Sequence, residues 1–222
     1  NQKFCFTIHG EDIYLFTLSN RKGTEVLVTN YGASITSFKV KMRDGNYNDI
    51  VLGFDTPEEY ITENYLGQYA YFGAAIGRYA NRIKNSSFII DNTKFSVTPN
   101  MGRNQLHGGK EGFDKKIWSV LSFENNVLQL KYLSKDGEEG FPGNLETILR
   151  FELNDDDELS YEFTATTDIP TAVNLTHHSY FNLNNGEGPI DDTELKIYSS
   201  FILAKDDEDV CTGELISLEN TQ

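Results

Sequence analysis

The stretch IWSVLSFENNVLQLKYL, residues 117–133, and the stretch LETILRFELNDDDELSYEFTAT, residues 145–166, decide the fold class. Each contains two runs of β-branched, aromatic and aliphatic residues. Asn-Asn separates the first two runs and Asn-Asp-Asp-Asp the last two, and both are turn-forming sequences. Leu128, Leu130 and Tyr132 alternate with polar neighbours, which is typical of a strand with one buried face. Because short turns join these runs, they predict antiparallel hairpins.

Similar strand-like runs occur along most of the remaining chain, at residues 4–8, 13–18, 24–29, 34–42, 88–90, 94–97 and 194–203. Asp91-Asn92 is a strong turn signal between two of these runs. Only Pro57 to Tyr60 predicts a short helical turn, because proline suits the first helical position. No internal repeat or break in composition divides the 222 residues. The sequence therefore predicts one all-β domain of antiparallel sheets over residues 1–222.

The composition argues against several classes of function. The chain has 34 acidic and 19 basic residues and a net charge of −15, which disfavours nucleic acids and anionic membranes as partners. No run of about 18 apolar residues could span a bilayer, and the N-terminal residues do not resemble a signal peptide. Cys5 and Cys211 match no metal-ligand spacing and predict a reducing, cytoplasmic setting rather than a disulfide scaffold.

The segment from Tyr65 to Gly112 differs from this hairpin background, because it is rich in glycine, asparagine, arginine and aromatic residues. A long irregular segment inside a compact domain is usually functional or disordered, and the aromatic and arginine content of this one argues against disorder. Arg78 and Arg82 are four residues apart, which would place both on one face of a helix or of a strand. Asn81 beside Arg82 offers an amide and a planar guanidinium, which suit neighbouring hydroxyl groups.

Three histidines are candidates for chemistry. His107 lies in NQLHGG, residues 104–109, where two glycines allow a close backbone approach to a ligand; the alternative is a histidine of a flexible loop. His177 and His178 are adjacent in a predicted strand, so at most one of them lines a given pocket. A metal site of His107, His178 and a carboxylate is a weaker alternative, because no typical ligand spacing supports it.

Three segments, in the same order and with similar spacing, resemble motifs of the aldose 1-epimerase (galactose mutarotase) family: GRYANRI at 77–83, LHGG at 106–109 and NLTHHSYFNL at 174–183. Further segments are similar to the family at 30–33 (NYGA), 49–54 (DIVLGF) and 135–143 (KDGEEGFPG). The resemblance implies a large antiparallel β-sandwich, the galactose mutarotase-like supersandwich, with a sugar bound in an open cleft on one sheet.

The resemblance also implies an isomerase of galactose and carbohydrate metabolism. Such enzymes interconvert the α and β anomers of free aldohexoses such as galactose and glucose, without a cofactor or metal. His178 matches the family's acid, which protonates the ring oxygen, and His107 matches a second active-site histidine that contacts the sugar. His177 stands where the family usually has asparagine. The other expected substrate-binding residues are Asn81, Arg82, Ser179 and Tyr180.

The family's catalytic base, a glutamate, and a sugar-binding aspartate both lie towards the C-terminus, and neither matches a position in this chain. CTGEL at 211–215 resembles the family's P-T-G-E-L/I segment, and the sequence ends soon after it, at Gln222. We therefore expect the chain to lack the family's C-terminal third and, taken alone, to be at best a weak catalyst.

Two alternatives use the same fold. One is a non-catalytic sugar-binding protein, and the other is an epimerase-like relative that acts on hexose 6-phosphates. A phosphate site needs extra basic residues near the pocket. Lys110, Lys115 and Lys116 follow the His107 loop, but the LHGG and NRI segments favour neutral sugars. The sequence does not indicate an oligomeric state.

Overall fold

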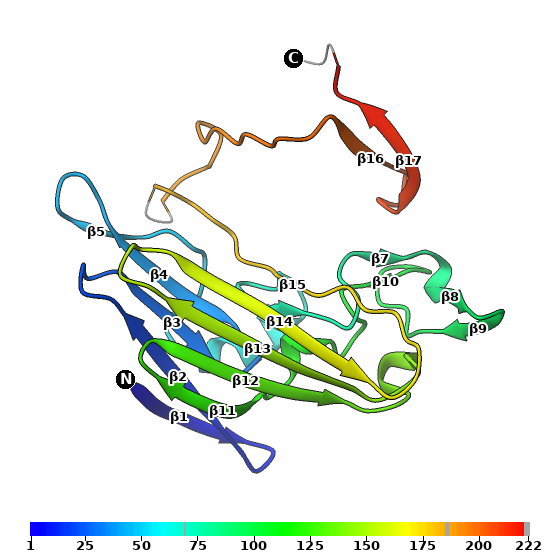
Figure 1. The fold of residues 1–222 in the computed structure, drawn as a ribbon, viewed down its shortest axis with the longest axis horizontal. Coiled ribbons are helices and arrows are strands. Elements are labelled where there is room, and N and C mark those ends of the chain that lie inside the picture. The colour runs from blue at the N-terminus through cyan, green and yellow to red at the C-terminus, as the bar shows by residue number, and fades with distance from the viewer. Residues whose placement is uncertain (69, 185–186, 220–222) are drawn as a thin grey trace.

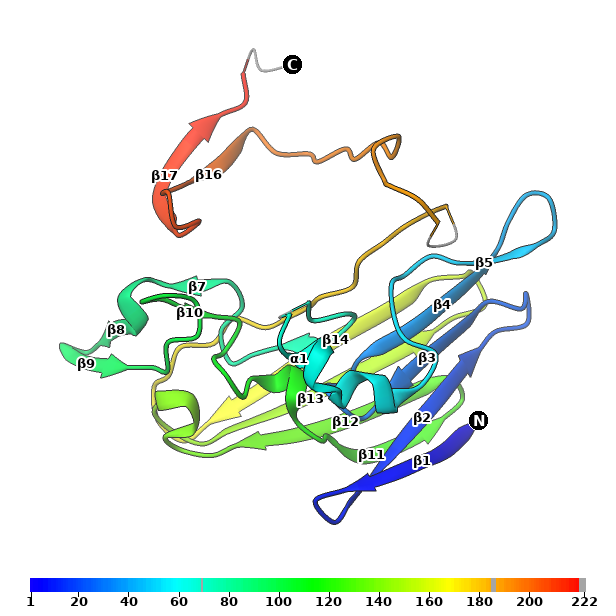
Figure 2. The same ribbon diagram turned by 180° about the vertical axis from the view of Figure 1, so that it is seen from behind.

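Two antiparallel sheets, each made of strands that follow one another in the chain, form the body of the molecule (Figures 1 and 2). The computed structural model describes residues 1–68, 70–184 and 187–219. The first sheet has the order β1 (Gln2–Ile8), β2 (Glu11–Ser19), β3 (Glu25–Thr29), β4 (Ile35–Lys41) and β5 (Tyr47–Asp49). The second has the order β11 (Ser119–Glu124), β12 (Val127–Ser134), β13 (Leu145–Leu153) and β14 (Leu159–Thr167). The predicted all-β class with antiparallel sheets is confirmed.

The turn signals of the sequence correspond to real hairpin turns. Asn125 and Asn126, between β11 and β12, have φ of 50° and 58°. Asp91 and Asn92 have φ of 48° and 62° and join β8 (Ser87–Ile90) to β9 (Thr93–Ser96). Two consecutive left-handed residues match the twist of an antiparallel pair, and Asn and Asp adopt this conformation more readily than most residues.

The hydrophobic core lies between the two sheets. It is formed by fully buried side chains of β2, β3, β12 and β13, among them Phe16, Leu18, Val26, Val28, Leu128, Leu130, Leu149 and Phe151. The rings of Phe16 and Phe123 meet edge to face across the interface, with centroids 5.2 Å apart. Along β13, buried and half-buried residues alternate without interruption. Each large apolar side chain buried here stabilises the fold by about 1.5–3 kcal/mol.

The chain between the two sheets contains only short elements. They are the 3₁₀ helix Pro57–Ile61, α1 (Glu63–Leu66), β6 (Ala75–Ile76), β7 (Arg82–Ile83), the 3₁₀ helix Lys84–Ser86, β8, β9, β10 (Gln105–Leu106) and the 3₁₀ helix Phe113–Lys115. A further 3₁₀ helix, Glu138–Gly140, follows β12. The helical turn predicted at Pro57 to Tyr60 is confirmed by the first of these helices. Of the other elements, β7, β8, β9 and β10 lie together at one end of the sandwich, whereas α1 lies nearer its middle (Figure 2).

The C-terminal part contains β15 (Thr176–His177), β16 (Phe201–Lys205) and β17 (Cys211–Ser217). The strand predicted at 194–203 is wrong in its first half, because regular pairing begins only at Phe201. Leu195 and Ile197 are two residues apart, as on one face of a strand, but are 83% and 68% exposed, and apolar alternation makes a strand only where a partner strand is present. The β16–β17 hairpin lies apart from both sheets, beyond β7 (Figure 1). The single domain over residues 1–222 stays a prediction.

Candidate active site

Pairing between β15 and β6 brings His178 to the irregular segment 65–112. Thr176 lies opposite Ile76 and His177 opposite Ala75. Beyond the regular strand, the His178 N–H donates to the carbonyl of Ala74 (2.8 Å), and its own carbonyl accepts from Gly73 (3.0 Å). Of the strand expected around 174–183, only Thr176–His177 is regular, yet these two bonds hold His178 firmly in place.

His177 and His178 have different surroundings. The half-buried ring of His177 contacts the carbonyl of Ala33 and the hydroxyl of Ser179, both at 3.2 Å, and packs against Phe151 and Tyr161. Burial lowers the pKa of His177 to about 4. Ser179 was expected at the sugar, but the structure places its hydroxyl beside His177, because residues two apart in an extended segment share a face.

The ring of His178 lies among three other rings. Its centroid is 5.1 Å from that of His107, 5.7 Å from Tyr71 and 4.9 Å from Tyr180. Tyr71 also lies 4.9 Å from His107, so its ring contacts both histidines, which in turn contact each other. The sequence analysis missed Tyr71. The only signal was the aromatic richness of the segment that contains it, which does not single out one residue.

The His107 loop depends on its two glycines. His107 itself has φ of 53°, and Gly108 and Gly109 have φ of 88° and 107°. A Cβ on Gly108 would overlap the carbonyl oxygen of Gly77, and one on Gly109 would overlap the carboxylate of Glu139. Glycine is therefore required both for the left-handed backbone and for the close contacts that place His107.

Asn100, which the sequence analysis also missed, closes this loop from the other side. Its Oδ1 accepts from the N–H of Leu106 (2.6 Å), and its Nδ2 donates to the carbonyls of Leu106 (3.0 Å) and Gly109 (2.9 Å). A single side chain thus satisfies three backbone groups around His107.

Two hydrogen bonds join His107 to Asn81. The His107 N–H donates to the carbonyl of Asn81 (3.0 Å), and the Asn81 N–H donates to Nδ1 of the His107 ring (2.9 Å). Nδ1 is thus the acceptor, and the proton of the neutral ring lies on Nε2. Burial, and then the positive charges of His178 and Arg82, lower the pKa of His107 to about 4. Burial also lowers the pKa of His178.

The side chains of Asn81 and Arg82 contact each other and the β16–β17 hairpin. Nη1 of Arg82 donates to Oδ1 of Asn81 at 3.3 Å, and Nη2 lies 3.7 Å from the carboxylate of Asp209. Nδ2 of Asn81 donates to Sγ of Cys211 at 3.9 Å. The expected hydroxyl-binding pair is therefore side by side, and β17 begins directly against it.

Arg78 has a structural role. It is 2% exposed, and its guanidinium donates to the hydroxyl of Ser134 (2.8 Å) and to the carbonyls of Ser134, Lys135 and Pro142 (2.8, 2.8 and 3.0 Å). Arg78 and Arg82 do not share a face, because the residues between them form neither a helix nor a regular strand. Arg78 holds the 134–142 loop, and Arg82 faces the candidate site.

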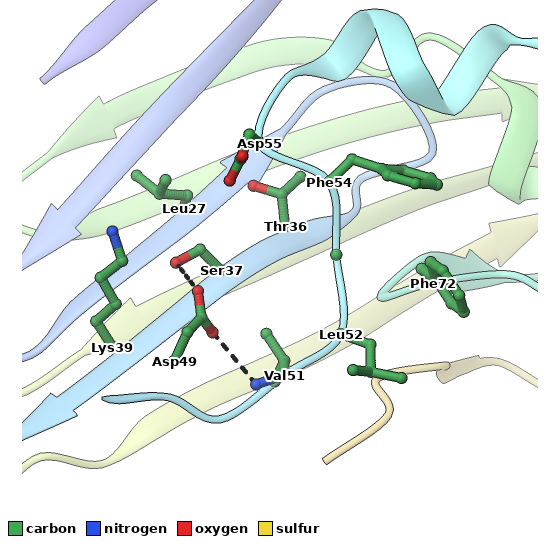
Figure 3. Close-up of a pocket in the computed structure, with 11 residues that line it drawn as sticks. Leu27, Thr36, Ser37, Lys39, Asp49, Val51, Leu52, Phe54, Asp55 and Phe72 are labelled. Carbon is green, nitrogen blue, oxygen red and sulfur yellow. Dashed lines mark hydrogen bonds between the residues drawn. The ribbon is translucent and has the colours of Figure 1, made fainter. Parts of the chain in front are cut away.

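The hollow in Figure 3, of about 510 Å³, lies elsewhere, and no expected site residue lines it. In it, the Asp49 carboxylate accepts from Ser37 and from the N–H of Val51. Phe72 connects the two regions, because it lines this hollow and its ring contacts Tyr180, with centroids 5.6 Å apart. The two histidines lie outside it, against the rings of Tyr71 and Tyr180.

Residues 1–68, 70–184 and 187–219 contain neither a metal-binding cluster nor a membrane-spanning helix. No group of three or more His, Cys, Asp or Glu side chains there could hold a metal ion. No helix in the same ranges is long and apolar enough to cross a membrane.

Comparison with known proteins gives consistent results. A family model described as aldose 1-epimerase matches residues 14–222. The chain is 37% identical to an aldose 1-epimerase of Escherichia coli (strain K12) over 212 residues, which is 96% of this chain and 60% of the relative. It is 40% identical to a galactose mutarotase of Bos taurus over 195 residues, which is 87% of this chain and 55% of the relative.

The solved structures that superpose on this chain point to the same family as these relatives. A GalM/aldose epimerase homologue from C. elegans superposes with a TM-score of 0.84 at 30% identity, covering 93% of this chain and 62% of that one. A galactose 1-epimerase from Lactobacillus acidophilus gives a TM-score of 0.85 at 27% identity, covering 100% and 63%. The chain spans 55–61% of the length of the curated relatives it matches. The expectation that it lacks the family's C-terminal third stays a prediction.

Proposed function

The chain belongs to the aldose 1-epimerase family, and we propose that the complete protein interconverts the α and β anomers of free aldohexoses such as galactose and glucose. The observation that carries this proposal is the meeting of His107 and His178, from distant parts of the chain, with ring centroids 5.1 Å apart. His107 is hydrogen-bonded to Asn81, so the histidine pair and the Asn81–Arg82 pair form one continuous group.

The chemistry needs a proton at the ring oxygen and the loss of a proton from the anomeric hydroxyl. The ring then opens to the aldehyde, rotation exposes the other face of C1, and closure gives the other anomer. His178 is the proposed acid. Its lowered pKa makes the protonated ring a stronger acid than free imidazolium, although a smaller fraction is protonated at pH 7.

His107 has a different proposed role. With a pKa of about 4 it is neutral at physiological pH, and its Nε2–H is a hydrogen-bond donor for a sugar oxygen that gains negative charge. Asn81 and Arg82 are the proposed partners of the sugar hydroxyls, and Tyr71 and Tyr180 provide ring faces beside His178. Environment thus separates the two histidines into an acid and a neutral donor.

The charges near the site favour a neutral sugar over a hexose 6-phosphate. Nζ of Lys115 lies 3.4 Å from the Asp114 carboxylate, and Nζ of Lys116 lies 3.8 Å from that of Glu138. Arg82 faces Asp209. Each of these cations is near a carboxylate, so an added phosphate would meet negative charge as well.

The same proposal includes a role in galactose metabolism and a cytoplasmic location. Cys5 and Cys211 are both free thiols, as expected in a reducing compartment.

Polarimetry on freshly dissolved α-galactose and α-glucose tests the proposal. The complete protein should speed the approach to anomeric equilibrium, and EDTA should not change the rate. A non-catalytic sugar-binding protein would leave the spontaneous rate unchanged while calorimetry detects binding. Loss of activity in EDTA, with recovery on adding a divalent ion, would contradict the metal-free mechanism.

A further inference from the structure

An acidic turn of the β16–β17 hairpin docks on basic residues that flank the proposed sugar site. Three ion pairs make this contact: Lys84 with Asp206 (2.8 Å), Arg103 with Glu208 (2.8 Å) and Arg82 with Asp209 (3.7 Å). Val210, which is 4% exposed, anchors the turn, and its N–H donates to the carboxylate of Asp206.

The Arg82–Asp209 pair is the one that reaches the site. The two Nη atoms of Arg82 have different partners, with Nη1 on Asn81 and Nη2 facing Asp209. Nε of Arg82 is buried and has no hydrogen-bond partner among the residues that the structure describes. The orientation of the guanidinium therefore depends on these two contacts, one from its neighbour in sequence and one from the hairpin.

Asp209 is well placed to act as a fixed negative charge. Oδ1 lies 2.7 Å from Nζ of Lys205, and Oδ2 faces Arg82. The hydrogen bond from Lys205, and then the positive charges of Lys205 and Arg82, lower the pKa of Asp209, so the carboxylate is ionised at neutral pH. An unpaired guanidinium is a planar fork that prefers carboxylates and phosphates. Pairing with Asp209 reduces that preference.

We propose that Asp209 is a positioning and specificity-determining residue: it holds Arg82 beside Asn81 and offsets its charge, so that the pair binds neutral sugars in preference to anionic ones. This inference rests on the proposed interconversion of sugar anomers and adds to it the class of sugar that the site prefers. Asp209 is expected to change the preference for neutral sugars only modestly. Its side chain is 53% exposed, and exposed ion pairs contribute weakly and are screened by salt.

The test uses the complete protein with D-glucose and D-glucuronate, which differ only by a carboxylate in place of the C6 hydroxymethyl group. Polarimetry gives kcat and KM for both sugars at low and high salt. Asp209→Asn should raise the glucuronate-to-glucose ratio of kcat/KM about 3- to 10-fold at low salt and less at high salt, as expected for one partly screened charge. The KM for glucose should rise about 2- to 5-fold with little change in kcat.

Two variants serve as matched controls. Asp207→Asn removes the same charge from the same turn, and among the described residues the ion pairs of this turn use Asp206, Glu208 and Asp209 but not Asp207. It should leave the sugar ratio within twofold. Asp209→Glu keeps the charge and should keep the natural preference. An unchanged ratio in Asp209→Asn, or an equal rise in Asp207→Asn, would overturn the proposal.

A double-mutant cycle separates this proposal from the proposed function. Arg82→Met and Asp209→Asn are combined, and urea unfolding is followed without any sugar. Non-additive losses of stability support the positioning contact, and additive losses overturn it even in an active enzyme. A natural protein that accelerates neither sugar refutes the proposed function and, with it, the specificity role.

Discussion

The two-sheet body and the segment 65–112 are built by different means. In the body, strands follow one another, and the central strand β13 alternates without interruption between buried and half-buried side chains. In the segment, β6, β7 and β10 have two residues each, and the geometry depends on single contacts such as the bonds made by Asn100 and Arg78. Many apolar residues could fill an alternating core. A loop held by individual hydrogen bonds and glycines tolerates far fewer changes, and the candidate site lies there.

The largest effect on catalysis is expected at the boundary between these regions, where His177 faces the body and His178 faces the segment. Replacing His178 with Gln in the complete protein should lower kcat by about 10²-fold or more, the usual scale for losing a general acid. Replacing His177 with Asn should leave kcat within a few-fold, because its ring contacts Ala33 and Ser179 and not the other histidines' rings. Polarimetry measures both, and equal losses would contradict this division.

The body could be predicted well because its signal is local. The bounds expected for the strand at 145–153 coincide with β13, and the two Asn and Asp turn pairs were visible in the sequence. The strand expected at 194–203 failed because alternation does not reveal whether a partner strand exists.

The site was predictable only in part. The resemblance pointed to His107 and His178, but no local pattern places Tyr71 against both of their rings. The alternation that separates His177 from His178 also puts Ser179 on the same side as His177, away from His178. The Arg82–Asp209 pair joins residues far apart in sequence, and such contacts are set by the fold.

Arg78 and Arg82 both lie in the segment, and the stability of their variants separates a structural residue from a binding residue. Arg78→Met should lower the free energy of unfolding by about 3–5 kcal/mol, because it leaves several carbonyls around the 134–142 loop without their donor. Arg82→Met should cost less than about 1 kcal/mol, because its ion pair is partly exposed. Urea unfolding of both variants measures the difference. Similar losses would show that the two residues do not divide structure and binding in this way.

A smaller loss of stability is expected when Gly108 or Gly102 is replaced with alanine. Gly108→Ala should destabilise the protein by about 2–3 kcal/mol, because it adds overlap with Gly77 to the cost of a left-handed alanine. Gly102→Ala is the matched control, with φ of 59° and open space around its Cβ position, and it should cost only about 1 kcal/mol. Thermal unfolding compares the two. The dependence of the loop on close approach would be refuted by equal losses.

The smallest expected effect is on the pH dependence of stability, and it concerns His177, on the side of β15 that faces the body. The pKa of His177 falls from 6.5 in the unfolded chain to about 4 in the fold, so the unfolded state binds more protons between these values. Stability from the neutral ring is thus full above pH 6.5 and is lost as pH falls towards 4. Between pH 7.5 and pH 4, the free energy of unfolding of His177→Asn should fall by about 1–3 kcal/mol less than that of the natural protein. A slope remains from His107 and His178, whose pKa values shift in the same direction. Urea unfolding at pH 7.5, 6, 5 and 4 measures both curves, and parallel curves would mean that His177 is not enclosed by the body.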